Sequence, residues 1–394
     1  MNKKNIDLVI LAGGKGTRIK KYLKGYPKPM LKFNKKYFLT YILNLTSKYN
    51  FNKIFILTGY RSKIIFKNFH NKSFNFIKVK CLKENDEMGT AGALSLLKGK
   101  VNDFVLLNGD TLFDIDYLKL INSLEKKKIG IVSLVKNISQ NSVKLNALSL
   151  HKNLIKYNNG KLMNGGVYFF RKKILKIIPK KKCSLENDIL PKLIKNKRVN
   201  GKIFKDFFLD IGTEKYYKKT SNLLIKNLKK PAAFLDRDGV INYNYGYVHS
   251  KKKFKFKYGV LKGLKYLTKK KYYLFIVTNQ AGIGKRIFSL KQFIELHREL
   301  KDDFIKHKIY INDVKYSPFH IDAKIQKFKK KSGFRKPGNL MIKEILKNWD
   351  ILINKSFMIG DKISDKMCAE KSDLYFEFAK DNFYYQARSI VKKG

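Results

Sequence analysis

Short apolar runs alternate with longer amphipathic stretches along the chain. In the first half, the runs predict β-strands at 8–12, 53–58, 76–81, 104–108, 130–135 and 166–170. Apolar residues at helical spacing predict helices at 39–48, 91–97 and 117–127. This alternation is typical of a mostly parallel sheet that is covered by helices on both faces.

The second half repeats the α/β pattern at smaller size. Its predicted strands lie at 233–236, 273–278 and 357–361, and its helices at 261–269, 290–307 and 340–348. A helix at 215–228 closes the first half, and Pro231 cannot easily continue it. We therefore predict two α/β domains, residues 1–228 and 229–394.

Composition agrees with two domains. The chain has 394 residues, of which 44% are hydrophobic, enough for two cores. The formal net charge of +56 is nearly all lysine, spread along the chain without a separate basic tail. This spread predicts a lysine-coated surface rather than a nucleic-acid-binding protein, although the charge can attract polyanionic substrates.

Three cysteines, Cys81, Cys183 and Cys368, fit no disulfide or zinc spacing and indicate a reducing cytoplasm. The apolar run at 8–11 follows two lysines, as in a signal peptide, but Asp7 interrupts it and a glycine-rich turn follows. No apolar stretch is long enough to span a bilayer. We predict a soluble, cytoplasmic protein with no membrane partner.

The first candidate site begins at the turn after the first strand. Gly13, Gly14 and Gly16 would let backbone N–H groups approach a triphosphate, and Arg18 and Lys28 add cations. The turn alone is weak evidence, because it lacks the GxxxxGK[ST] ending and could be purely structural.

Later residues strengthen this interpretation. The loop 87–92 has small residues suited to packing against a nucleoside. Asp110 and Asp210 each come at the end of an apolar run. Two carboxylates at strand ends can share one Mg²⁺ with phosphate oxygens.

With LAGGKGTR, PKPM, GTAGA, NGD, NGGVY, SLENDILP and DIGT in this order, residues 1 to about 225 resemble the sugar-1-phosphate nucleotidylyltransferases. They are most similar to D-glycero-D-manno-heptose 1-phosphate guanylyltransferases. The resemblance implies a Rossmann-like mixed sheet and Mg²⁺ at Asp110 and Asp210. It also implies that Arg18 and Lys28 are catalytic cations that bind the triphosphate, with a substrate- and nucleotide-binding set of Leu11, Ala12, Gly13, Gly14, Gly16, Thr17, Gly89, Thr90, Asn108, Asn164, Gly165 and Glu186.

One departure concerns the stretch 157–163, which is shorter than the Phe-x-Glu-Lys-like element that the family has before its Asn-Gly-Gly turn. Lys161 could supply the missing cation for the sugar phosphate. Whether the shorter stretch lowers transferase activity stays open.

The second candidate site begins at Asp236-Arg-Asp-Gly239, directly after a strand. One carboxylate can attack phosphorus while the other protonates the leaving oxygen and later activates water. Their mutual repulsion calls for a cation such as Mg²⁺. A calcium loop can also begin with Asp-x-Asp-Gly, but the residues that follow lack the acidic ligands of an EF-hand.

Three later segments supply partners for a phosphate. Thr278, Asn279 and Gln280 end a strand with a hydroxyl and two amides, and Arg335 and Lys336 add cations. Acidic residues end a further strand in the segment Asp361-Lys362-Ile-Ser-Asp365.

This order of motifs resembles the haloacid dehalogenase-like phosphatases over residues 231–394. The segment is most similar to D-glycero-D-manno-heptose 1,7-bisphosphate 7-phosphatases, which also resemble histidinol phosphatase. The resemblance implies an uncapped Rossmannoid domain, with Asp236 as nucleophile, Asp238 as acid/base, and Thr278 and Lys336 stabilising the phosphoryl group. Its implied Mg²⁺ set is Asp236, Asp238, Asp361, Lys362 and Asp365. Many relatives have a Cys/His zinc loop before Arg-Lys-Pro, but here only His320 remains, so we predict no zinc.

Together these resemblances predict one bifunctional enzyme of GDP-heptose biosynthesis that acts on GTP and phosphorylated heptose. The same two reactions on other substrates, such as a hexose phosphate or histidinol phosphate, remain an alternative. So does a non-enzymatic protein that binds nucleic acid. The preference for GTP follows from resemblance alone, and the oligomeric state stays open, a homo-oligomer included.

Overall fold

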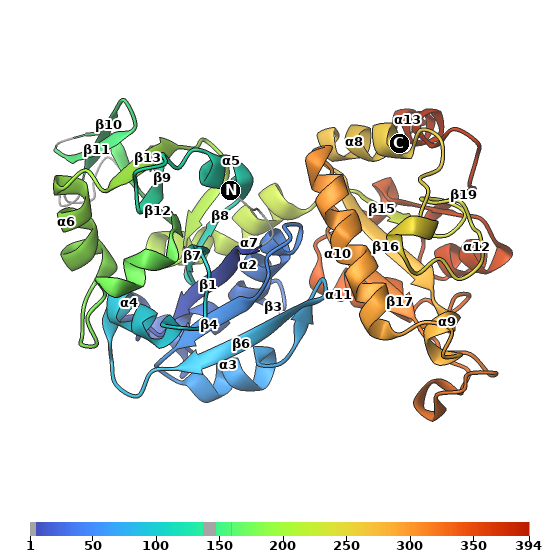
Figure 1. Cartoon of the computed structure of the whole chain (residues 1–394), viewed down its shortest axis with the longest axis horizontal. Helices are drawn as coiled ribbons and strands as arrows, with labels where there is room; N and C mark the ends of the chain where they lie inside the picture. Colours follow the sequence, from blue (N-terminus) through green and yellow to red (C-terminus); the bar gives the residue numbers. More distant parts are fainter. Residues whose placement is uncertain (1–4, 137–146, 159, 394) are drawn as a thin grey trace. The chain divides into compact units, whose positions relative to one another are not determined.

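The computed structural model describes residues 5–136, 147–158 and 160–393. It divides into two compact units, one of Met1–Leu43 and Phe51–Leu223 and the other of Asn44–Asn50 and Leu224–Gly394 (Figure 1). The predicted domain boundary after residue 228 falls at the end of helix α7 (Glu214–Leu228), whereas the two units divide within this helix, between Leu223 and Leu224.

The first unit contains a mixed sheet, in the order β11-β10-β12-β7-β1-β4-β6-β5, with β9 pairing β12 and β13. Its central strands β7, β1, β4 and β6 are parallel, and β12 runs antiparallel to β7. The strands are β1 (Asp7–Ala12), β4 (Ile54–Thr58), β5 (Ser73–Phe74), β6 (Ile77–Lys83), β7 (Phe104–Asn108), β9 (Gly130–Lys136), β10 (Leu148–His151), β11 (Leu154–Tyr157), β12 (Leu162–Phe170) and β13 (Val199–Ile203).

Helices cover both faces of this sheet. Every residue of β4 is buried, and because side chains alternate along a strand, both of its faces must be covered. On one face, Phe55 packs in a common core with Leu94 and Leu190. The helices are α1 (Lys20–Leu23), α2 (Phe38–Ser47), α3 (Ser62–Phe69), α4 (Gly89–Gly92), α5 (Tyr117–Asn122), α6 (Leu190–Lys195) and α7, with the 3₁₀-helix η4 (Ala93–Leu97) and the π-helix η6 (Leu185–Ile189).

Two short strand pairs lie outside this sheet. β2 (Lys32–Phe33) pairs with β3 (Lys36–Tyr37), and β8 (Thr111–Phe113) pairs with β14 (Phe208–Asp210). The second pair joins segments that lie far apart in the sequence, and it contains Asp210, one of the predicted Mg²⁺ ligands.

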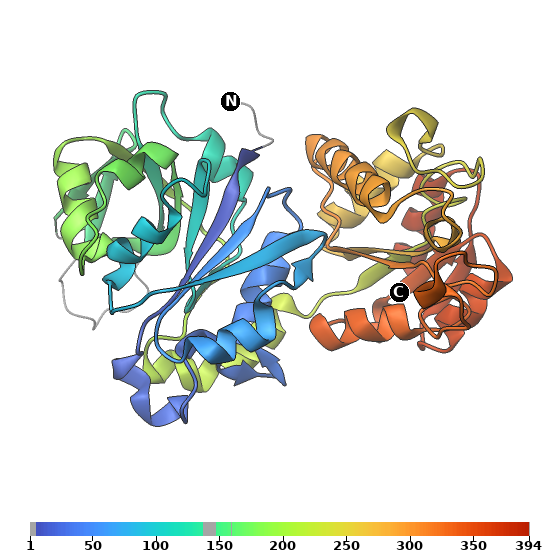
Figure 2. The ribbon, with the colours of Figure 1, turned by 60° about the horizontal axis from the view of Figure 1, so that its bottom comes forward.

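The second unit is a parallel five-stranded sheet in the order β17-β16-β15-β18-β19 (Figure 2). The strands are β15 (Ala232–Leu235), β16 (Tyr273–Asn279), β17 (Asp313–Ser317), β18 (Phe357–Gly360) and β19 (Tyr375–Phe378). The helices are α8 (Val260–Lys269), α9 (Ala281–Gly284), α10 (Leu290–Lys306), α11 (Leu340–Asn348), α12 (Ile363–Glu370) and α13 (Phe383–Lys393). The predicted fold class, two α/β units with a mixed and a Rossmannoid sheet, is confirmed.

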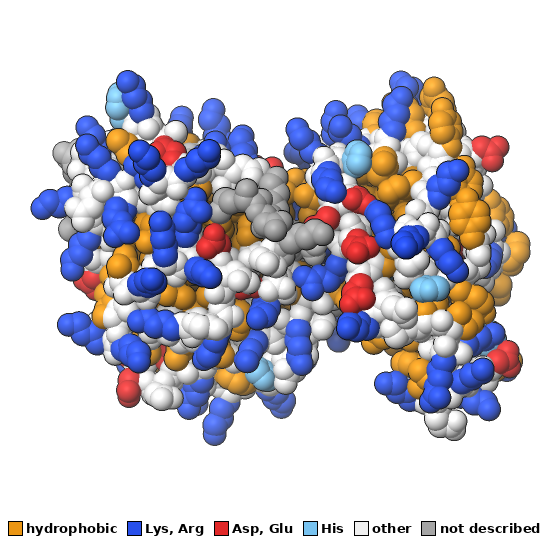
Figure 3. All heavy atoms as spheres, in the orientation of Figure 1, with side chains coloured by type: hydrophobic (Ala, Val, Ile, Leu, Met, Phe, Trp, Pro, Cys, Tyr) orange, Lys and Arg blue, Asp and Glu red, His pale blue; other side chains and the backbone are white. Residues whose placement is uncertain are grey.

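Basic side chains are scattered over the visible face of each unit and do not gather in one patch (Figure 3). This distribution matches the even spread of lysine along the sequence. Within the described residues, no helix combines the length and the apolar character that crossing a bilayer requires.

Candidate active sites

The pairing of β8 with β14 brings two acidic residues of the first unit together. Asp110 follows β7, and Asp210 ends β14 opposite Thr111. The backbone N–H of Ile211 donates a hydrogen bond to the carbonyl oxygen of Asp110 at 3.1 Å. The structure therefore places the two predicted Mg²⁺ ligands side by side.

The charge of this pair is only partly offset. Lys28 Nζ lies 2.6 Å from Asp110 Oδ2, and the Lys28 side chain is only 11% exposed. Burial raises the pKa of Asp210 and Asp110 raises it further, whereas Lys28 and Arg18 lower it. A hard divalent cation would relieve the repulsion between the two carboxylates, so these residues fit Mg²⁺.

Close backbone contacts shape the glycine-rich turn after β1. Gly16 has φ +66°, a conformation that favours glycine, and a Cβ there would come within 3.2 Å of Lys28 Cε. A Cβ on Gly13 would collide with Glu84 Oε1. Gly14 is exposed and faces open space, so a ligand can approach the backbone there.

Three predicted residues meet around a tyrosine that the sequence analysis missed. Asn164 Nδ2 donates to the Tyr168 hydroxyl at 2.7 Å, and that hydroxyl donates to Glu186 Oε1 at 3.3 Å. Thr90 Oγ1 donates to Glu186 Oε2 at 2.7 Å. Burial, together with Glu186, raises the pKa of Tyr168 well above its usual value, so its hydroxyl stays protonated. In a regular strand residues four apart share a face, but the register of β12 with β9 shifts between Asn164 and Tyr168, so alternation alone could not identify Tyr168.

The remaining predicted residues of this unit have mixed surroundings. Leu11, Ala12 and Asn108 end strands β1 and β7, Gly89 opens α4, and Thr17 is exposed. The buried Asn108 Oδ1 accepts no hydrogen bond from any described residue, which leaves it available for a ligand. A Cβ on Gly165 would crowd Phe113 at 2.6 Å, so packing alone accounts for this glycine.

The shortened stretch 157–163 is described except for Asn159, which lies outside the described residues. Lys161 is exposed. Tyr157 is close enough to Glu186 for that carboxylate to raise the pKa of the Tyr157 phenol, after the larger effect of burial. The stretch therefore borders the Glu186 side of the site.

In the second unit, carboxylates from three segments form a compact cluster. Asp236 follows β15, Asp361 follows β18, and Asp365 lies in α12. One oxygen from each lies within 4.8 Å of the others. Asp361 Oδ1 is buried and has no hydrogen-bond partner among the described residues, whereas Oδ1 of Asp236 and of Asp365 pair with Lys336. Three clustered carboxylates beside a single ammonium keep an excess of negative charge, which fits a hard cation such as Mg²⁺.

Lys336 balances part of this negative charge. Its ammonium lies 2.8 Å from Asp236 Oδ1 and 2.6 Å from Asp365 Oδ1, and donates a hydrogen bond to the Val277 carbonyl at 2.8 Å. Burial raises the pKa of Asp236 to about 6 even though Lys336 lowers it. Burial alone would lower the pKa of Lys336, but Asp236 and Asp365 raise it overall.

Two residues of the predicted metal set lie outside this cluster. The carboxylate of Asp238 accepts hydrogen bonds from Arg237, at 3.0 and 2.8 Å, from Asn242 at 3.0 Å and from Gln280 at 2.9 Å, and these donors fix its orientation. Lys362 contributes a cationic side chain, which has no lone pair for a metal. The carboxylate set that the structure assembles is therefore smaller than the predicted one.

Arg237 is a site residue that the sequence analysis missed. Its side chain is fully buried, and besides Asp238 it donates to the Val248 carbonyl. Buried arginines are uncommon, so no local pattern pointed to it. Arg237 therefore helps to fix the orientation of the Asp238 carboxylate.

His297 lies near Arg237 and Asp238, and its burial should make the stability of the protein depend on pH. Burial, and then Arg237, lower the pKa of His297 to about 3, from an ordinary value of 6.5. Below pH 6.5 the unfolded chain takes up a proton that the folded chain does not, so the free energy of unfolding decreases as the pH is lowered. By pH 5.5 the loss is about 1.4 kcal/mol. Urea unfolding at pH 7.5 and 5.5 should show a smaller loss for His297→Gln than for the native protein.

The matched control is His307→Gln on the exposed end of the same helix, which should keep the native pH dependence. Equal pH dependence in His297→Gln and the native protein would contradict the assignment.

The residues that the sequence predicts to bind phosphate line a pocket of about 440 Å³ beside the cluster. The pocket includes the predicted residues Thr278, Asn279, Gln280 and Arg335, and also Tyr247, Lys285 and His320. Asn279 exchanges two hydrogen bonds with the backbone of Lys336, at 3.1 and 3.0 Å. It therefore holds the lysine in place rather than acting only on phosphate.

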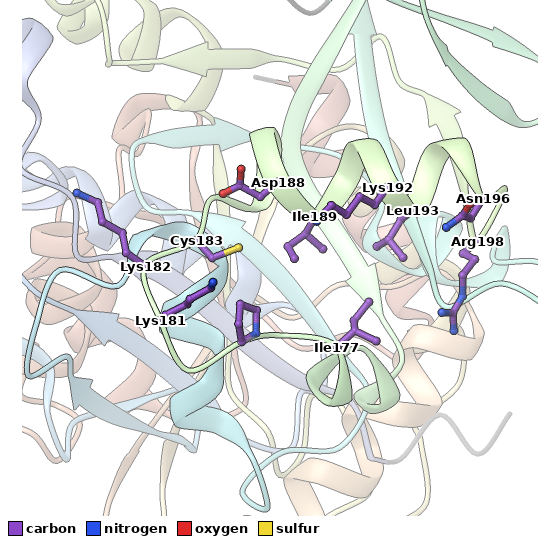
Figure 4. A pocket seen from close by; sticks show the side chains of 11 residues that line it. Ile177, Lys181, Lys182, Cys183, Asp188, Ile189, Lys192, Leu193, Asn196 and Arg198 are labelled. Carbon is purple, nitrogen blue, oxygen red and sulfur yellow. The ribbon is translucent and has the colours of Figure 1, made fainter.

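A different pocket of about 600 Å³ lies in the first unit (Figure 4). Ile189 and Leu193 point from η6 and α6 toward Ile177, and Lys181, Lys192 and Arg198 are also in its lining. None of the predicted site residues lines it.

Comparison with known proteins separates the same two halves. Residues 8–144 match a family model described as Nucleotidyl transferase, and residues 232–385 match one described as Polynucleotide kinase 3 phosphatase. A D-glycero-α-D-manno-heptose 1-phosphate guanylyltransferase of Campylobacter jejuni is 34% identical over 221 residues, which cover 54% of this chain and 97% of the relative.

The second half has relatives of another kind. A D-glycero-β-D-manno-heptose-1,7-bisphosphate 7-phosphatase of Rhodopseudomonas palustris is 36% identical over 146 residues, 37% of this chain and 81% of the relative. Its counterpart in Photorhabdus laumondii is 39% identical over 139 residues, 35% of this chain and 74% of the relative. The protein is thus an enzyme that joins a nucleotidyltransferase to a phosphomonoester hydrolase. It belongs to the heptose 1-phosphate guanylyltransferase family through its first half and to the heptose bisphosphate phosphatase family through its second.

Proposed function

We propose that the second unit removes the 7-phosphate of D-glycero-α-D-manno-heptose 1,7-bisphosphate, and that the first unit transfers GMP from GTP to the resulting heptose 1-phosphate. The observation that carries this proposal is the pairing in one chain of two families whose relatives act on a heptose 1,7-bisphosphate and on a heptose 1-phosphate, which are the substrate and the product of 7-phosphate removal, apart from the anomer. Each unit has its own acidic site, which supports two separate active centres. The proposed location is the cytoplasm.

In the phosphatase unit, a carboxylate oxygen of Asp236 would attack the 7-phosphorus and form an aspartyl phosphate as the bond to the sugar oxygen breaks. Asp238 would protonate that oxygen and then take a proton from the water that hydrolyses the intermediate. Lys336, which lies beside Asp236, would offset charge on the phosphoryl group. Asp236, Asp361 and Asp365 would hold Mg²⁺, which supplies further charge neutralisation.

In the transferase unit, a phosphate oxygen of heptose 1-phosphate would attack the α-phosphorus of GTP, and pyrophosphate would leave. Lys28 and Arg18 would stabilise the negative charge, and Asn164 and Glu186 would orient the sugar hydroxyls. Asp110 and Asp210 would hold Mg²⁺, which neutralises phosphate charge. Such a transfer depends on positioning and electrostatics, and needs no protein nucleophile.

Two further cations support a doubly phosphorylated substrate for the second unit. Lys285 and Arg335 line the same pocket as Asp236. Lys285 lies 3.9 Å from Asp322, and among the described residues neither cation pairs with the acidic cluster. They are therefore available to bind the phosphate that is not hydrolysed.

The anomer follows from the requirement that both steps share one intermediate. The transferase relative is named for the α-anomer, and the phosphatase relatives are named for the β-anomer. Hydrolysis at position 7 leaves the bond at C1 untouched, so the anomer that enters the first step reaches the second. The two steps therefore share one anomer, and we propose α, the anomer in the name of the transferase relative.

Phosphorus NMR of a single reaction with Mg²⁺ and GTP tests this function. With the α-bisphosphate, inorganic phosphate should appear first, followed by pyrophosphate and a GDP-sugar. With the β-bisphosphate, no GDP-sugar should form. Formation of GDP-sugar only from the β-anomer, or from hexose 1-phosphate in preference to heptose 1-phosphate, would overturn the assignment.

A further inference from the structure

The pocket of about 600 Å³ in the first unit has no part in the proposed mechanism (Figure 4). Its apolar lining includes Ile177, Ile189 and Leu193, and Ile177 is 40% exposed although it is large and apolar. Pockets of this size, with apolar walls and a few polar groups, are typical of sites for small organic molecules. The apolar hollow distinguishes this place from the lysine-coated surface around it.

The charged groups of the lining favour an anionic ligand. Four of the lining side chains are cations, namely Lys181, Lys182, Lys192 and Arg198. Within the part of the chain that the structure describes, Lys182 alone of these forms an ion pair, with Glu87 at 3.9 Å. Asp188 is the acid of the lining, and its Oδ2 accepts a hydrogen bond from the Ser184 backbone N–H at 2.7 Å. The pocket therefore keeps an excess of positive charge.

The arrangement of these side chains fits a nucleoside diphosphate. Figure 4 shows Lys181 and Arg198 toward opposite ends of the group, with Ile177, Ile189 and Leu193 between them. Lysine ammonium groups can bind a diphosphate at one end, and aliphatic side chains can pack against ribose and base. At the other end, an arginine can donate hydrogen bonds to acceptors on the base edge. An inorganic anion would leave the apolar lining uncovered.

The backbone beside this pocket packs directly on the loop 89–92 of the transferase site. The carbonyl of Cys183, a lining residue, accepts a hydrogen bond from the Ala91 N–H at 2.9 Å. A Cβ on Gly89 would lie 2.6 Å from the Cys183 carbonyl oxygen, and one on Gly92 would lie 2.5 Å from that of Lys181. Because backbone packs on backbone here, a shift of 181–183 must also shift 89–92.

The same segment continues into η6, which contains Glu186. The Leu185 N–H donates to Thr90 Oγ1 at 2.8 Å, and Thr90 Oγ1 donates to Glu186 Oε2 at 2.7 Å. Ile189, in the pocket lining, ends η6. One π-helical turn thus connects the pocket with the carboxylate that the proposed function assigns to the sugar.

We propose that this pocket binds a nucleoside diphosphate, free or as part of a nucleotide sugar, and that its occupation weakens binding of heptose 1-phosphate. Lys181 and Lys182 would turn toward the diphosphate, and the loop 89–92 would follow their backbone and draw Thr90 away from Glu186. The binding inference depends on the pocket alone, whereas the effect on the sugar rests on the proposed function.

Calorimetric titration with GDP tests the binding site. The double variant Lys192→Glu/Arg198→Glu should bind one GDP fewer per chain than the native protein, whatever binds at the transferase site, because two cations become acids. The matched control is Lys195→Glu/Lys197→Glu, which changes exposed lysines outside the lining and should keep the native stoichiometry. An unchanged number of sites in Lys192→Glu/Arg198→Glu, or equal affinity of the pocket for GDP and pyrophosphate, would overturn the inference.

Initial rates at saturating GTP test the coupling, because GTP then excludes GDP from the transferase site. GDP should raise the KM for heptose 1-phosphate about 5-fold in the native enzyme and leave it unchanged in Lys192→Glu/Arg198→Glu. An equal rise in both proteins would contradict the coupling. GDP-mannose distinguishes the two sources: tighter binding than GDP identifies a nucleotide sugar as the ligand, and weaker binding identifies the free nucleotide.

The two proposals can fail separately. A protein that loses one GDP site in Lys192→Glu/Arg198→Glu, but whose native form transfers nothing to heptose 1-phosphate, would contradict the proposed function and leave the binding inference intact. Native transfer with no loss of a GDP site would do the reverse.

Discussion

Asp236→Asn is expected to lower the release of phosphate from heptose 1,7-bisphosphate by about 10⁴-fold, because the amide cannot form the aspartyl phosphate. Guanylyl transfer from heptose 1-phosphate should stay within about two-fold of the native rate, since Asp236 belongs to the second unit alone. Phosphate and pyrophosphate release, assayed separately on the two sugar phosphates, gives both rates.

The conservative replacement also limits damage to the fold. It keeps the volume of Asp236 and removes one of the like charges that crowd Asp365. Asp381→Asn on the exposed surface of the same unit is the control and should leave both rates unchanged. Loss of both activities in Asp236→Asn, with an unchanged melting temperature, would show that the sites are not independent.

Asp210→Asn should have the opposite selectivity. We expect guanylyl transfer to fall about 10³-fold, because the half-buried pair of Asp110 and Asp210 would lose one of its two charges for Mg²⁺. Phosphate release should be unaffected. Raising the Mg²⁺ concentration should restore part of the lost rate, because weaker binding of the ion is one cause of the defect.

The readout is the Mg²⁺ dependence of pyrophosphate release. Glu125→Gln, an exposed acid of the first unit, should give the native curve. A native curve for Asp210→Asn would exclude this carboxylate from the metal site.

Much of the scaffold could be predicted from the sequence because its central strands are uninterrupted apolar runs. β1, β7, β15 and β18 are buried on both faces, and each ends at the small or acidic residues of a site. The edge strands were not predicted. β19 is exposed at both of its ends, so no run of buried residues predicts it. In β17, apolar residues alternate with polar ones, so the strand lacks an uninterrupted apolar run. The helix predicted at 117–127 ends at Asn122, where Ser123 caps the Lys119 carbonyl.

Some site residues can be recognised from a local pattern, whereas others depend on contacts between segments that lie far apart in the sequence. Asp110 and Asp236 follow apolar strands and could be recognised locally. The position of Asp210 beside Asp110 depends on the pairing of β14 with β8, which no local pattern reveals. The orientation of Asp238 depends on Arg237, whose burial cannot be read from a strand-end motif.

Mixing the two inactivated variants tests the central claim that one chain contains two separate centres acting in sequence. From the α-bisphosphate with GTP and Mg²⁺, Asp236→Asn alone should form no GDP-heptose, and Asp210→Asn alone should accumulate heptose 1-phosphate. The equimolar mixture should form GDP-heptose, because the intermediate can pass from one variant to the other. A mixture that forms none, from variants that each retain their remaining activity, would contradict the account.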